Sequence, residues 1–233
     1  MLRQTHPTPE TRLAHANLAQ SKWLAQFCAW CGVAAPLVYI ATVIGGAASI
    51  PGYSHVGDTI SSLTEAGRSG VDWIQSDFAV YNLLIAVFAI SGFAVLRGHR
   101  VWAWIFSLLL LTSLCGLLMG PFPQDPIGAA TTLAGTLHIG LAAVTSLATV
   151  LVIALSFFAL AGQRSVVLTF ILSVSLVLTL PFGLVTAFAV ANSWPMMGLF
   201  ERLTIGGFEI WVFAIGLVMA TGSDLLVAGL AKK

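Results

Sequence analysis

Polar side chains that could bind or react with a ligand are confined to three short segments of an otherwise apolar chain. The first segment holds Ser54 and Asp58, the second begins at Asp125, and the third holds Glu201 and Arg202. An arginine can hold a phosphate or a carboxylate through two parallel hydrogen bonds, and carboxylates and hydroxyls can bind sugar or amine groups. Together these segments predict one polar pocket, beside an apolar slot that takes an acyl chain.

Two further ionisable residues, His138 and Glu209, lie inside apolar stretches. Such residues are rare within a membrane and by default indicate a functional site. Glu209 shares a helical face with Arg202 and Gly206 but lies about 10 Å further along the axis, so another residue or a water must be its partner. His138 should point into the protein, because it lies on a stripe of small or polar residues. That stripe comprises Thr131, Ala134, His138, Ala142, Thr145 and Thr149.

The same polar residues permit a second interpretation, a metal-dependent hydrolase within the membrane. His55, Asp58, Asp125 and His138 are of the types that bind zinc, and Glu201 could act as a base on a metal-bound water. None of them shows a diagnostic ligand spacing such as H-E-x-x-H. The primary expectation is therefore a site with no metal and no cofactor.

The composition excludes several classes of protein. The chain has 233 residues, of which 58% are hydrophobic and 8% are charged, whereas soluble domains carry about 25% charged residues. This excludes a soluble enzyme and a disordered chain. No basic run is present, so a nucleic-acid partner is not expected. The three cysteines lie in apolar stretches, and their odd number argues against a disulfide framework.

Six apolar stretches are long enough to cross a membrane, which takes about 20 residues. Continuous runs of this length form helices, because the strands of a membrane barrel are about 10 residues long and alternate in polarity. The expected fold is therefore an all-α, polytopic bundle of six transmembrane helices. The predicted spans are residues 27–48, 77–96, 101–120, 134–161, 166–190 and 204–230.

The distribution of basic residues predicts the orientation, because lysine and arginine are enriched in cytoplasmic segments. Both termini are expected to be cytoplasmic, with residues 1–25 as a tail and residues 26–233 as one membrane domain of a cell membrane. The predicted outer loops are residues 49–76, 121–133 and 191–203. Arg68 and Arg202 are the only lysine or arginine residues in these loops. The predicted inner segments contain Arg3, Arg12, Lys22, Arg97, Arg100, Arg164, Lys232 and Lys233.

The first outer loop carries a regular pattern of polar residues. Ser54, Asp58, Ser61 and Glu65 follow one another at helical spacing, which predicts that they share one face of a helix.

The chain resembles a bacterial and archaeal family of membrane proteins catalogued as domain of unknown function 998. GYSHVGDTISSL matches the family pattern Y-S-x-x-x-D-x-I-S-x-L, and GPFPQD and GLFERL are two further landmarks. The resemblance covers residues 26–230 and implies a six-helix membrane protein, without an activity. The residues at matching positions are Ser54, Asp58, Asp125, His138 and Arg202.

A weaker similarity exists to the six-helix family of autophagy modulators and lipid-anchor remodelling proteins, which also have a serine- and aspartate-bearing first outer loop. It favours membrane lipids as partners, and the leading hypothesis is a protein that binds or remodels a lipid or small amphiphile at the outer face. Two alternatives remain besides the hydrolase. One is a small carrier that uses His138 and Glu209, and the other is an accessory subunit that binds another membrane protein or a second copy of the chain.

Overall fold

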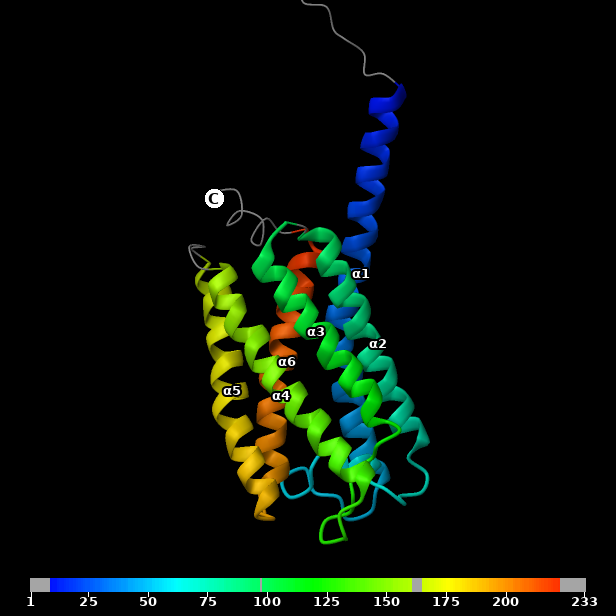
Figure 1. The fold of residues 1–233 in the computed structure, drawn as a ribbon, viewed down its shortest axis with the longest axis vertical. Coiled ribbons are helices and arrows are strands. Elements are labelled where there is room, and N and C mark those ends of the chain that lie inside the picture. Colours follow the sequence, from blue (N-terminus) through cyan, green and yellow to red (C-terminus); the bar gives the residue numbers. More distant parts are fainter. Residues whose placement is uncertain (1–8, 97, 161–164, 223–233) are drawn as a thin grey trace, which may run out of the picture.

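The computed structural model describes residues 9–96, 98–160 and 165–222, and this part of the chain is a bundle of six long helices without strands (Figure 1). Each helix contains a stretch long and apolar enough to cross a membrane. The prediction of an all-α, multi-pass membrane protein is therefore confirmed. The helices are α1 (Pro9–Ser49), α2 (Asp72–Val95), α3 (Arg100–Met119), α4 (Leu133–Leu160), α5 (Val166–Ala191) and α6 (Met197–Ala220), with a short 3₁₀ helix, η1 (Ser61–Thr64).

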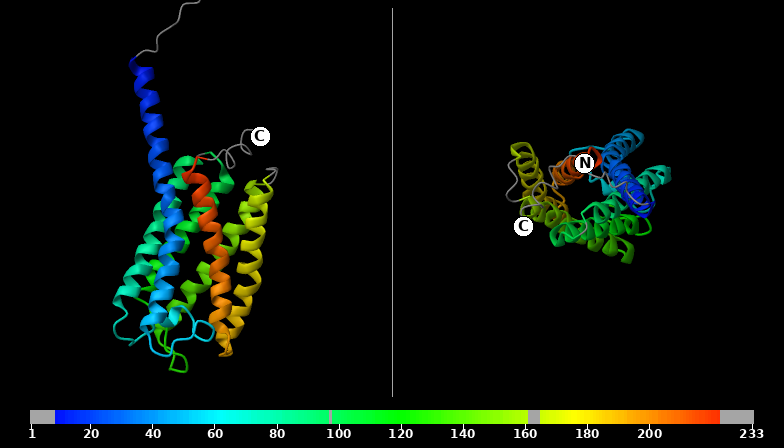
Figure 2. Two further views of the ribbon diagram at one scale, coloured as in Figure 1. Left: turned by 180° about the vertical axis from the view of Figure 1, so that it is seen from behind. Right: turned by 90° about the horizontal axis from the view of Figure 1, so that it is seen from above.

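The helices form a ring in which neighbours along the chain pack against each other. Helix α6 packs against both α5 and α1 and so brings the end of the bundle back to its beginning (Figure 2). Two long connections, residues 50–71 and 120–132, and the short one at residues 192–196 gather at one end of the bundle. We refer to this end as the loop end; it corresponds to the predicted outer face.

Helix α1 is much longer than the predicted span of residues 27–48. It begins at Pro9 and has 41 residues, which gives a length of about 60 Å, twice the thickness of a bilayer core. Figure 1 shows it projecting well beyond the other helices at the end opposite the loop end. The predicted tail, residues 1–25, is therefore helical from Pro9 onward. Proline is favoured in the first turn of a helix, and the alanines and leucines that follow are strong helix formers.

Helix α6 begins at Met197, seven residues before the predicted start at residue 204. Glu201 and Arg202 consequently lie in its first turns and not in a loop. The prediction was wrong here because the span was defined by apolar residues alone, although charged side chains fit the end of a membrane helix that meets a polar loop. The predicted end at residue 230 lies outside the described residues. So do several residues of the charge count, namely Arg3, Arg97, Arg164, Lys232 and Lys233.

Two buried apolar clusters hold the bundle together. The larger lies among the helices and includes Phe88, Phe106 and Trp211. The smaller lies under the first long connection, where Ile60 and Leu63 pack against α1 and α2. The connection is thus anchored by its own apolar residues. All three cysteines are free thiols in the structure.

Helix α6 approaches its neighbours closely where it carries glycine. A Cβ atom on Gly216 would lie 2.7 Å from the backbone of Gly32 in α1, and one on Gly207 would lie 2.5 Å from the hydroxyl of Thr179 in α5. Small residues allow helix backbones to come together in membrane proteins. Gly206, by contrast, faces open space, with no heavy atom within 4 Å of an added Cβ atom.

Candidate functional site

The first long connection lies directly across the beginning of α6. The backbone N–H of Leu199 donates to the Val56 carbonyl over 3.0 Å, which satisfies one of the N–H groups left free at a helix start. The Glu201 carboxylate accepts a hydrogen bond of 2.5 Å from the backbone N–H of Ile60. Glu201, one of the predicted ligand-binding residues, therefore holds the connection in place.

Arg202 makes a second set of contacts with the same connection. Its Nη1 donates to the carbonyl oxygens of Asp58 and Gly198, each over 2.9 Å, and its Nη2 donates to the Tyr53 hydroxyl over 2.6 Å. The Tyr53 hydroxyl in turn donates to the Thr59 carbonyl over 2.8 Å. Burial raises the pKa of the Tyr53 phenol, although the nearby guanidinium opposes this shift, so Tyr53 stays protonated at neutral pH.

These contacts leave Arg202 without a direct ion-pair partner among the described residues. A guanidinium has five N–H donors, and three of them are used in the contacts above. The Nε atom is buried and has no hydrogen-bond partner. Within residues 9–96, 98–160 and 165–222 the one ion pair joins Arg68 and Glu65, so no carboxylate lies within ion-pair distance of Arg202. The unused donors suit an anionic ligand.

Ser54 and Asp58 form a local turn. The Asp58 carboxylate accepts a hydrogen bond of 2.7 Å from the backbone N–H of Ser54, and the Ser54 hydroxyl accepts one of 3.1 Å from Gly57. The expected helix through Ser54, Asp58, Ser61 and Glu65 is not formed, since only η1 is helical here. The prediction was wrong because the side chains of Ser and Asp compete with helix formation by bonding to nearby backbone.

A small polar pocket lies beside this turn. It has a volume of about 330 Å³ and is lined by the first connection and by Pro126 and Ile127 of the second. Asp58, Glu65 and Arg68 contribute its polar wall.

Asp125 and His138 organise the second long connection. The Asp125 carboxylate accepts hydrogen bonds from the backbone N–H and the hydroxyl of Thr132, over 2.8 and 2.7 Å, and these bonds lower the pKa of Asp125. His138 is 7% exposed and points into the bundle, as predicted. Its Nδ1 lies 2.9 Å from the Phe122 carbonyl. Because a carbonyl only accepts hydrogen bonds, Nδ1 carries the proton, and the buried Nε2 has no partner.

The two connections touch, but the predicted polar residues do not all meet. The N–H of Ala66 donates to the Gln124 carbonyl over 2.9 Å, and the Gln124 side chain reaches the Thr59 hydroxyl at 3.4 Å. In the described part of the chain, Asp125 and His138 form no hydrogen bond or ion pair with Arg202. The single pocket of the sequence analysis is thus divided: Ser54, Asp58, Glu201 and Arg202 lie together, and Asp125 and His138 belong to the neighbouring connection.

The alternative metal site is not formed. Across the residues that the structure describes, no three His, Cys, Asp or Glu side chains come together in a group that could hold a metal ion. The four candidates have other contacts: His55 packs edge-on against Tyr53, and Asp58, Asp125 and His138 bind backbone groups. The residues therefore do not fit the hydrolase interpretation.

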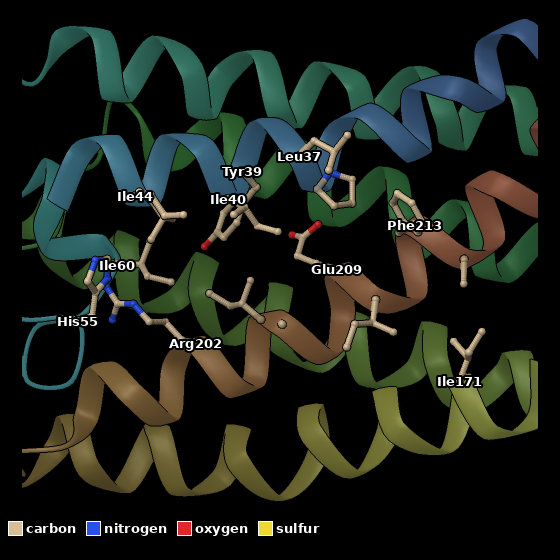
Figure 3. Close-up of a pocket in the computed structure, with 16 residues that line it drawn as sticks. Leu37, Tyr39, Ile40, Ile44, His55, Ile60, Ile171, Arg202, Glu209 and Phe213 are labelled. Carbon is tan, nitrogen blue, oxygen red and sulfur yellow. The ribbon is translucent and has the colours of Figure 1, made fainter. Parts of the chain in front are cut away.

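An apolar groove of about 540 Å³ runs along the bundle between α1 and α6 (Figure 3). Its walls are mainly aliphatic, with Leu37, Ile40 and Ile44 on α1 and Phe213 on α6. Figure 3 shows Arg202 and His55 together at one end of the groove and Glu209 further along it. The groove thus joins two of the predicted site residues, Arg202 and Glu209.

Glu209 is the one carboxyl group among the described residues that line the groove. The residue is 4% exposed, and its Oε1 accepts a hydrogen bond of 2.6 Å from the hydroxyl of Tyr81 on α2. The other oxygen, Oε2, is buried and has no partner. Tyr81 is the partner that the sequence analysis left unidentified, and the open backbone of Gly206 lies one turn closer to Arg202.

Tyr53 and Tyr81 were not among the residues predicted for the site. Tyr53 is the second residue of the GYSHVGDTISSL landmark, so its place beside Ser54 could have drawn attention to it. Tyr81 is one of few polar residues in an apolar span, which is a signal for a buried hydrogen bond. Nothing in the sequence distinguishes the open Gly206 from the tightly packed Gly207.

Comparison with known proteins yields one family. Neither the curated proteins nor the solved structures contain a match to this chain. The family described as "Protein of unknown function (DUF998)" matches residues 33–218, a range that includes the first long connection, the groove and all of the predicted site residues. Because the match covers most of the 233 residues, this chain belongs to the DUF998 family of integral membrane proteins.

Proposed function

We propose that this protein binds an amphiphile with an anionic head group in the groove between α1 and α6. The head group, a phosphate or a carboxylate, lies against Arg202 and His55 at the predicted outer face of a cell membrane. The apolar chain extends along the groove toward Phe213. The unpaired guanidinium at the end of an apolar groove is the observation that carries this proposal.

The size and lining of the groove support an apolar chain as its occupant. Its volume of about 540 Å³ lies within the range of about 300 to 1,000 Å³ that is usual for small-molecule sites. Leu37, Ile40 and Ile44 are largely exposed along it. In a membrane these side chains meet acyl chains, so a lipid tail can enter from the side without leaving an apolar environment.

The polar end supports an anion over a neutral or cationic group. Arg202 retains two N–H donors, and one of them is the buried Nε–H. A phosphate or carboxylate offers acceptor oxygens to both at once. It also forms the direct ion pair that Arg202 does not make with any described residue.

Binding is better supported than chemical remodelling of the bound molecule. Glu201 precedes Arg202 in the chain and Asp58 offers its carbonyl to Arg202, and the carboxylates of both residues accept hydrogen bonds from the backbone of the first connection. They serve to position the loop and do not point to a nucleophile or base held ready for a head group. The groove also suits a helix of another membrane protein, which the experiment below distinguishes.

The proposal is tested by filling the groove. In Gly206→Leu the new side chain enters open space of the groove, so the fold is retained while the occupant is excluded. Gly140→Leu is the matched control, because Gly140 also has no neighbour within 4 Å and lies on α4, away from the groove. Native mass spectrometry of the gently purified protein in a defined mixture of phosphatidic acid and phosphatidylcholine reads the bound lipid directly.

We expect the wild type and Gly140→Leu to retain phosphatidic acid and Gly206→Leu to lose it. Arg202→Gln should weaken this binding by about tenfold or more, since hydrogen bonds to charged groups are worth about 1.5–3 kcal/mol. Arg100→Gln, at the opposite end of the bundle, controls for the loss of a positive charge. Equal lipid binding by Gly206→Leu and the wild type would overturn the proposal, as would a co-purifying protein displaced by Gly206→Leu in the absence of any lipid effect.

A further inference from the structure

We infer that the groove recognises a second polar group on its occupant, a hydroxyl or amide N–H on the apolar chain that donates a hydrogen bond to Glu209. The inference rests on the proposed function and narrows the class of ligand. The occupant is then an anionic amphiphile whose chain carries a hydrogen-bond donor some distance from the head group.

The first support is the incomplete bonding of Glu209. Its Oε1 is satisfied by the Tyr81 hydroxyl at 2.6 Å, and its Oε2 is buried without a partner. The residue is 4% exposed and lines the groove, and Figure 3 shows its carboxyl group between α1 and α6. Buried polar groups in proteins are nearly always hydrogen-bonded, so an oxygen left free on a groove wall indicates a donor on the occupant.

The second support is the position of Glu209 relative to Arg202. The two residues are seven positions apart on α6, which places them about 10 Å apart along the helix axis. A donor within the head group itself would lie at Arg202 and could not also reach Glu209. The donor must therefore be on the chain.

The third support is the opening between the two residues. Gly206 lines the groove and has no heavy atom within 4 Å of an added Cβ atom. The occupant can therefore lie close to the α6 backbone while it reaches both Arg202 and Glu209. The wall beside Gly206 includes the aliphatic Ile205 and Ile210, so Glu209 and Tyr39 are the polar residues that a chain can meet at this depth.

The consequence is selection against plain acyl chains. A plain chain covers the free Glu209 oxygen without bonding to it, and a site built to bond a polar group rejects ligands that lack it. A chain with a donor at the right depth completes the bonding of Glu209. The preference for the donor-bearing chain should be about tenfold.

The test uses three probes that differ at one position: stearate, stearate with a mid-chain hydroxyl, and stearate with a mid-chain ketone. Their affinities for the full-length protein in detergent are compared by competition in native mass spectrometry. The wild type should prefer the hydroxyl probe about tenfold over stearate, and the ketone, which only accepts hydrogen bonds, should gain nothing. Glu209→Met should bind stearate and the hydroxyl probe equally.

Glu209→Gln keeps the result interpretable if Glu209→Met fails to fold. The Gln carbonyl can accept the bond from Tyr81 while its NH₂ group faces the groove, so this variant should gain affinity for the ketone probe. A wild type that binds stearate but shows no preference for the hydroxyl, or prefers the ketone, overturns the inference and leaves the proposed function intact. Failure of all three probes to bind, or binding unaffected by Gly206→Leu, overturns the proposed function itself.

Discussion

The guanidinium of Arg202 donates a 2.6 Å hydrogen bond to the hydroxyl of Tyr53 and so joins the beginning of α6 to the loop that follows α1. The two residues are 149 positions apart in the chain. The tyrosine ring also lies under the cation, with 5.6 Å between the guanidinium carbon and the ring centroid. Any ligand at this end of the groove therefore meets an arginine that is already fixed in place.

Removing the Tyr53 hydroxyl should destabilise the protein. Tyr53→Phe deprives Arg202 of an acceptor and Thr59 of a donor, and we expect a cost of about 1–3 kcal/mol, measured as a lower Tm in detergent. The same substitution in an Arg202→Met background should cost less, because the two residues are coupled. Equal costs in both backgrounds would show that the hydrogen bond contributes no stability.

Adding a methyl group at the crossing of α1 and α6 should also destabilise the bundle. In Gly216→Ala the new Cβ atom lies 2.7 Å from the backbone of Gly32, so the helices must separate, at a cost of about 1–3 kcal/mol. Gly206→Ala is the matched control on the same helix, because its Cβ atom meets nothing within 4 Å. Thermal unfolding of both variants should rank Gly216→Ala clearly below Gly206→Ala.

The contribution of Asp125 should depend on pH. Hydrogen bonds from Thr132 lower the pKa of this carboxyl below its ordinary value of 3.8, so the ionised form stabilises the fold at neutral pH. That stabilisation is present above the ordinary pKa and is lost as the pH falls through the lower, folded value. The difference in Tm between wild type and Asp125→Asn should be largest at neutral pH and shrink in strong acid. A Tm difference that stays constant from neutral pH to strong acid would contradict a stabilising role for the ionised Asp125 carboxylate.

A buried hydrogen bond between α4 and α6 offers a further test. The indole N–H of Trp211 donates to the Ser156 hydroxyl over 2.9 Å, and both residues are fully buried. Ser156→Ala leaves this N–H unpaired, which should cost about 1–3 kcal/mol. Ser173→Ala, at a half-buried position where the hydroxyl bonds to the carbonyl of Thr169 in its own helix, should change Tm little. Similar losses in the two variants would argue against a specific role for the Trp211 bond.

The predicted orientation can be measured with single cysteines. In a background without Cys28, Cys31 and Cys115, Ser69→Cys places an exposed thiol at the loop end and Thr221→Cys places one at the opposite end. A membrane-impermeant maleimide should label Ser69→Cys in intact cells and Thr221→Cys only after lysis. The reverse pattern would place the loop end in the cytoplasm and would contradict the charge-based prediction.

The number and type of helices followed from the sequence because the membrane imposes one strong rule. An unbroken apolar run of about 20 residues must form a helix to satisfy its backbone. The positions of the helix ends were predicted less accurately from the sequence, because this rule does not act outside the apolar core of the membrane. Pro9 to Lys22 continue α1 by ordinary helix propensity, and Met197 to Leu203 extend α6 although they include Glu201 and Arg202.

The membrane also explains why some of the site residues could be predicted. The cost of burying charge identified Arg202, Glu209 and His138 as residues that need partners. The identity of those partners depends on tertiary packing, which places Tyr53 and Tyr81 beside residues far away in the chain. Asp125 and His138 were expected beside Arg202, but they are engaged instead by Thr132 and Phe122.

Three glycines of α6 make close contacts with other parts of the protein at three levels along the helix. Gly198 fits against the Asp58 carbonyl, Gly207 against Thr179 and Gly216 against Gly32. These contacts, with the first connection, α5 and α1, sterically oppose sliding or rolling of α6. With α6 kept in register, the side chains along its face of the groove keep their spacing, so the positions of Arg202 and Glu209 relative to each other are fixed by the helix.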